Sequence, residues 1–188
     1  MKQLLKITGL CTVTLIVLFI SYYCYNEVQR DKIRNIKINV NRSVLKKIEP
    51  IHPYPFCKHS AKYQYVIFYD SLHCTQCTIN RLYEWNSLIE MTIQRKVPID
   101  FIFIFEAKGD NINKIIRLFH QSHFMHPIYI DSIGYYVREN PLANNTMYHA
   151  VITDNNGYIK MIGNAATSTI STNNFKKFLN LEKQRYKL

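Results

Sequence analysis

Blocks of apolar and polar positions predict an α/β domain after about residue 62. Residues 63–69 and 99–105 are short, nearly continuous apolar runs rich in aromatic and β-branched side chains, which is typical of buried strands. Between them, an apolar stripe at helical spacing predicts a helix over 74–95. The stripe consists of Ile79, Leu82, Trp85 and Ile89. Strand, helix and strand in close succession indicate a parallel crossover, with 99–105 as a central strand.

The pattern after residue 105 continues the same alternation and closes with a hairpin. We expect helices over 111–122, 134–140 and 173–184 and strands over 127–131, 148–153 and 158–162. Asn156-Gly157 supplies the positive φ angles of a tight turn, so the last two strands are expected to be antiparallel. The predicted domain covers residues 63–188.

An uncharged run at the N-terminus predicts a membrane segment. Ile7–Tyr25 follows Lys2 and Lys6 and is long enough to cross a hydrocarbon layer of about 30 Å as a helix. A cleaved signal peptide is the alternative, but the run ends without the small residues that signal peptidase needs. Lipidation at Cys24 is disfavoured by the bulky Tyr23 before it. We expect residues 1–25 to be an uncleaved signal-anchor.

Residues 26–62 read as a basic, irregular tether. Nine Lys and Arg against three acidic residues give this segment a net charge of +6, against +11 for the chain. It suits either contact with anionic headgroups or a solvated linker, and both interpretations stay open. No nucleic-acid motif accompanies the charge, so we expect no nucleic-acid partner. The count of basic residues favours a cytoplasmic domain, whereas the short basic N-terminus before the apolar run is typical of export. We expect a single-pass protein whose C-terminal domain is periplasmic.

Cys74-Thr75-Gln76-Cys77 is the strongest chemical signal in the chain. The motif follows a predicted strand and opens a predicted helix, where unpaired N–H groups and the helix dipole favour a thiolate. The spacing brings the two sulfurs close enough to close a small disulfide ring. The pattern predicts redox chemistry.

The order of these elements resembles the thioredoxin superfamily over about residues 63–184. The extra helix and strand within 111–131 are similar to the insertion of membrane-tethered proteins of the TlpA/ResA and alkyl hydroperoxide reductase branch. The resemblance implies an α/β thioredoxin-like fold with a mixed sheet. It also implies that Cys74 is the attacking thiol and Cys77 the resolving one, with no cofactor and with envelope protein thiols or disulfides and a redox partner as partners. We expect Cys74 to be the accessible nucleophile and Cys77 to lie deeper, against the sheet.

The chain departs from the thioredoxin pattern in two places: at the motif, where Thr75-Gln76 also lacks the usual proline, and before the penultimate strand. His73 stands where thioredoxins usually have tryptophan, and it could lower the pKa of Cys74 as a cation or be a surface residue without a role. The proline expected before the penultimate strand is absent from Met147-Tyr148-His149, so we expect a trans loop that lets His149 approach the sulfurs. His73, Tyr148 and His149 are therefore predicted modulators of the pair.

Other functions remain open at this stage. Cys74 and Cys77 with His73, His149 or the Cys57/His59 pair could bind copper(I) or zinc in a non-enzymatic metal-binding or delivery domain. A redox-inert interaction module is a further alternative, and a peroxidase is a weaker one. With Cys57 the number of cysteines outside the membrane run is odd, so Cys57 either pairs with another molecule, reacts as a free thiol or is a buried apolar residue. Cys11 and Cys24 are expected to be apolar fillers of the membrane run.

Overall fold

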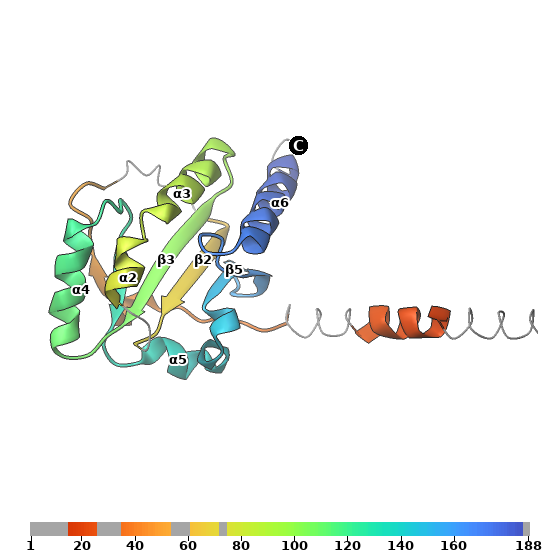
Figure 1. Cartoon of the computed structure of the whole chain (residues 1–188), viewed down its shortest axis with the longest axis horizontal. Helices are drawn as coiled ribbons and strands as arrows, with labels where there is room; N and C mark the ends of the chain where they lie inside the picture. Colours follow the sequence, from red (N-terminus) through yellow and green to blue (C-terminus); the bar gives the residue numbers. More distant parts are fainter. Residues whose placement is uncertain (1–14, 26–34, 54–60, 72–74, 186–188) are drawn as a thin grey trace, which may run out of the picture. The chain divides into compact units, whose positions relative to one another are not determined.

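The chain divides into two units, one ending at Ile36 and one beginning at Lys37. A computed structural model describes residues 15–25, 35–53, 61–71 and 75–185 (Figure 1).

In the first unit, residues 15–25 form a helix whose side chains are exposed, Cys24 included. These are the described residues of the run expected to cross the membrane; Cys11 lies outside them. Within the described residues, every helix falls short of the length and apolar character that a membrane span requires. The anchor therefore stays a prediction.

The second unit is built on a six-stranded mixed sheet in the order β1-β4-β3-β2-β5-β6. Its strands are β1 (Lys46–Ile48), β2 (Tyr63–Tyr69), β3 (Ile99–Glu106), β4 (Ile128–Asp131), β5 (Ala150–Asp154) and β6 (Ile159–Ile162). β2, β3 and β4 run parallel, whereas β1 is antiparallel to β4, β5 to β2 and β6 to β5. The predicted central strand and the predicted hairpin are confirmed. A parallel pair joined by helices, followed by an antiparallel hairpin and a closing helix, is a thioredoxin-like arrangement.

Helices connect the strands and close the unit. They are η1 (Arg42–Val44), α2 (Thr75–Asn80), α3 (Glu84–Gln94), α4 (Asp110–Gln121), α5 (Tyr135–Glu139), η2 (Pro141–Asn144), η3 (Thr146–Tyr148) and α6 (Thr169–Arg185). The prediction of a single helix over 74–95 is wrong, because a tighter turn separates α2 from α3. In that turn the amides of Leu82 and Trp85 donate to carbonyls only three residues earlier, at 3.1 and 3.0 Å.

An aromatic cluster on one face of the sheet packs the sheet against helices α3 and α6. The Tyr65 ring on β2 lies 5.2 Å from Trp85 of α3 and 5.5 Å from Phe175 of α6, and Phe103 of β3 lies 5.4 Å from Trp85. All four side chains are buried, and each contributes about 2–3 kcal/mol by leaving water. Because side chains alternate along a strand, Phe68 faces the other way. It packs against Tyr136 of α5 at 4.8 Å.

Part of the segment expected to be a tether belongs to this unit. The amide of Ile38 donates to the carbonyl of Gly157 at 2.9 Å, Arg42 forms an ion pair with Asp100 of β3, and β1 pairs with β4. We expected the domain to begin at Tyr63, but the folded unit starts at Lys37. The segment lacks a long apolar run and is fixed by isolated buried side chains, which are Ile38, Leu45 and Ile48.

Candidate active site

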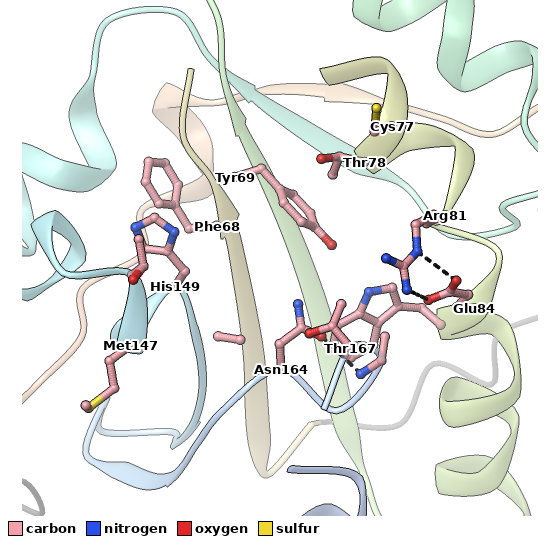
Figure 2. Close-up of a pocket in the computed structure, with 14 residues that line it drawn as sticks. Phe68, Tyr69, Cys77, Thr78, Arg81, Glu84, Met147, His149, Asn164 and Thr167 are labelled. Atoms are coloured by element: carbon pink, nitrogen blue, oxygen red, sulfur yellow. Dashed lines mark hydrogen bonds and ion pairs between the residues drawn. The ribbon is translucent and has the colours of Figure 1, made fainter. Parts of the chain in front are cut away.

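A pocket of about 360 Å³ opens at the carboxyl end of β2 (Figure 2). Four segments meet there: the end of β2, the α2–α3 region, η3 with the start of β5, and the loop between β6 and α6. The lining residues are Phe68, Tyr69, Cys77, Thr78, Arg81, Glu84, Trp85, Thr146, Met147, His149, Ala150, Asn164, Ala166 and Thr167. The topology thus brings one cysteine of the motif together with segments about 70 to 90 residues further along the chain.

Cys77 is exposed at the edge of this pocket. We expected it to lie deeper, against the sheet, and this is wrong. Ile79 is the fully buried residue of α2, and a residue two positions away points to the opposite side of a helix. Cys74 and His73 lie outside the described residues, as do Cys57 and His59.

An ion pair forms the wall of the pocket one helical turn beyond Cys77. The Arg81 guanidinium donates from Nε to Glu84 Oε1 at 2.9 Å and from a terminal nitrogen to Oε2 at 3.1 Å, as the dashed lines in Figure 2 show. The hydrogen bond to Glu84 raises the pKa of Arg81. The pocket therefore carries a cation whose charge is largely balanced by its neighbour. We did not predict this pair, although its three-residue spacing in a predicted helix is a usable signal.

Tyr69 places a phenol in the middle of the pocket (Figure 2). Its ring stacks on Phe105 with centroids 4.6 Å apart. Burial raises the pKa of Tyr69, and hydrogen bonding to Trp85 opposes that shift. The phenol thus stays protonated near neutral pH. The sequence placed Tyr69 at the end of a buried strand and gave no sign of this position.

The loop before β5 is trans, as predicted: the described part of the chain contains no cis peptide bond. His149 Nε2 lies 2.9 Å from the carbonyl oxygen of Ala143, so this nitrogen carries a proton and donates it. The imidazole meets the Phe68 ring edge-on at 5.2 Å. In Figure 2, His149 and Cys77 lie on opposite sides of Tyr69, so the expected approach of His149 to this sulfur is not observed. Tyr148 is half-buried and is not among the lining residues.

The buried Tyr65 side chain fixes the β6–α6 loop through its hydroxyl group. The Tyr65 hydroxyl donates to the carbonyl of Gly163 at 2.6 Å and accepts from the amide of Ala165 at 3.0 Å. Gly163 has φ of +122°, which favours glycine, and Asn164 accepts from the amide of Ala166 at 3.0 Å. A buried side chain thus positions the wall formed by residues 164–167.

The metal alternative gains no support from the described residues. Of its candidate ligands, only Cys77 and His149 fall within them. Among all described residues, no group of three or more His, Cys, Asp or Glu side chains is arranged to hold a metal ion.

No protein-family model matches the sequence, and no curated protein matches it either. Solved structures similar to this chain are thioredoxin-like proteins. An uncharacterized thioredoxin-like protein from Porphyromonas gingivalis is 18% identical, with a TM-score of 0.44 over 63% of this chain and 74% of its own. A thioredoxin-like protein in the oxidized form is 12% identical, with a TM-score of 0.45 over 79% and 94%. A domain of a possible thiol-disulfide isomerase from Cytophaga hutchinsonii is 18% identical, with a TM-score of 0.40 over 69% and 81%. The strand order and connectivity, rather than these distant likenesses, identify the fold as thioredoxin-like.

Proposed function

We propose that this protein is a membrane-anchored thiol-disulfide oxidoreductase that works through Cys74 and Cys77. The observation that carries the proposal is the exposure of Cys77 beside a pocket at the carboxyl end of β2. A strand that leads into a Cys-x-x-Cys motif and a helix is the arrangement that thiol exchange needs.

In this proposal the Cys74 thiolate attacks one sulfur of a substrate disulfide and displaces the other sulfur as a thiolate, which takes up a proton. A mixed disulfide then joins Cys74 to the substrate. Cys77 loses its proton, attacks Cys74 and releases the second substrate thiol. Two electrons pass from the cysteine pair to the substrate, one proton comes from Cys77 and one from solvent, and the protein is left with a Cys74–Cys77 disulfide.

A redox titration of the full chain in a mild detergent tests this function. We expect a two-electron transition between the dithiol and the disulfide, and we expect it to be lost in both Cys74→Ser and Cys77→Ser. Cys24→Ser is the matched control, because it removes an exposed thiol from the other unit of the chain. A transition that survives Cys77→Ser, or none in the unaltered chain, refutes the proposal. Repeating the titration with zinc or copper(I) tests the metal alternative.

The membrane part of the proposal places the domain on the external side, in contact with envelope protein thiols and a redox partner. It is supported by the uncharged run Ile7–Tyr25 behind a short basic N-terminus. A C-terminal alkaline phosphatase fusion should be active and a C-terminal cytoplasmic fluorescent reporter dark. The reverse pair of results would place the domain in the cytoplasm.

A further inference from the structure

In the loop that precedes β5, the main-chain N–H groups are hydrogen-bonded within the loop itself. The amides of Met147 and Tyr148 donate to the side-chain and main-chain oxygens of Asn145, both at 2.9 Å, and the amide of His149 donates to the carbonyl of Thr146 at 3.1 Å. The carbonyl of His149 accepts from the amide of Phe68 at 2.6 Å. Binding of an extended polypeptide by strand addition requires main-chain groups that are open to the incoming strand. Three successive N–H groups of this loop already have partners, so the loop is poorly suited to that mode.

The pocket next to this loop is suited to a compact ligand. Its volume of about 360 Å³ lies within the range of small-molecule sites, about 300–1,000 Å³. Thr78 stands on the Cys77 side, and Asn164 and Thr167 stand on the β6–α6 side, with the Tyr69 ring between them (Figure 2). Hydroxyl and amide groups of this kind bind the amides and carboxylates of a peptide-sized molecule.

We propose that the substrate of this site is a low-molecular-weight disulfide with a polar, peptide-like body rather than an extended polypeptide strand. One half of the disulfide occupies the pocket and presents its sulfur beside the cysteine motif. The inference rests on the proposed function and assigns its substrate class. The exchange is the one written above: the cysteine pair is oxidised to a disulfide, and the small disulfide is reduced to two thiols, each taking one proton.

The test compares two disulfides that differ in the size of their halves. The reduced full chain, in detergent, is mixed either with oxidised glutathione or with a linear, unstructured peptide dimerised through a disulfide between its single internal cysteines. We expect exchange with oxidised glutathione to be at least about tenfold faster at equal concentration, which corresponds to about 1.4 kcal/mol in the barrier. Equal rates, or a faster reaction with the peptide, overturn the inference and leave the proposed function intact. If neither disulfide reacts and the pair shows no redox transition, the proposed function itself fails.

Two pairs of variants locate the effect. Ala166→Phe fills the pocket and is expected to slow the reaction with oxidised glutathione at least about tenfold, whereas Thr169→Phe, an exposed change outside the lining, is expected to leave it unchanged. Asn145→Ala removes the oxygen that accepts from Met147 and is expected to raise the relative rate with the peptide. Asn145→Asp keeps that acceptor and should behave like the unaltered chain.

Asn41→Ala is the matched control for the loop variant. The Asn41 side chain caps η1 as the Asn145 side chain caps η3: it accepts a hydrogen bond from the amide two residues later, that of Ser43, at 3.1 Å. Asn41 does not line the pocket. Its loss should not change the ratio of the two rates. An unchanged ratio in Asn145→Ala together with unchanged exchange in Ala166→Phe would show that neither the loop nor the pocket selects the substrate.

Discussion

Tyr65 and Tyr136 are both fully buried, yet removal of their hydroxyl groups should have opposite effects on stability. The Tyr65 hydroxyl donates to Gly163 at 2.6 Å and accepts from the amide of Ala165 at 3.0 Å. The Tyr136 hydroxyl has no hydrogen-bond partner among the described residues. Tyr65→Phe therefore breaks two bonds that fix the pocket loop, whereas Tyr136→Phe removes a buried polar group that forms none in this part of the chain.

The expected size follows from these partners. A hydrogen bond contributes about 1 kcal/mol net, and a buried N–H left without a partner costs about 1–3 kcal/mol. Ala165 is only 2% exposed, so its amide cannot turn to water without local unfolding. We expect Tyr65→Phe to lower the free energy of unfolding by about 2–4 kcal/mol. Tyr136→Phe is expected to change it by less than about 1 kcal/mol, in the stabilising direction.

Urea denaturation of the full chain in detergent measures both variants. With a slope of about 2 kcal/mol/M, Tyr65→Phe should lower the midpoint by about 1–2 M while leaving the slope unchanged. Hydrogen exchange gives a local readout, because the amide of Ala165 should lose protection only in Tyr65→Phe. Equal destabilisation by the two substitutions would refute the reasoning, since it would show that the loss tracks the phenol group and not its hydrogen bonds.

Three other predictions test the charges and the backbone of the same unit. Burial lowers the pKa of His126 to about 4, so on acidification the unfolded chain takes up a proton at a higher pH than the folded chain does. The free energy of unfolding should therefore be unaffected by His126 above about pH 6.5 and should fall as the pH drops towards 4. His126→Phe should flatten this pH dependence, measured by urea unfolding at each pH. Glu84→Gln releases the Arg81 cation towards the pocket and should lower the thiol pKa of Cys77, measured by the pH dependence of its alkylation; an unchanged pKa would show that the cation does not act on the sulfur. Gly163→Ala should cost about 1–3 kcal/mol in urea unfolding, because φ of +122° strains any residue with a Cβ; an unaltered midpoint would contradict this.

The sequence by itself determined the central elements of the fold. β2 and β3 are nearly continuous apolar runs of seven and eight residues, and such runs form strands buried on both faces. The Asn-Gly turn before β6 likewise specifies its hairpin locally. The position of the cysteine motif between a strand and a helix was readable for the same reason, since it depends only on neighbouring residues.

Tertiary contacts decided what surrounds that motif. Residues from Lys37 to Ile48 join the sheet through isolated hydrogen bonds and one short strand pair with distant partners, and such contacts leave no periodic pattern in the sequence. The break between α2 and α3 is not visible in the continuous apolar stripe, whereas the exposure of Cys77 follows from its place two residues from the buried Ile79. The pocket depends on the meeting of β2, η3 and the β6–α6 loop, which are far apart in the sequence. Local propensity therefore specifies the scaffold of this protein, and long-range packing specifies the shape and charge of its site.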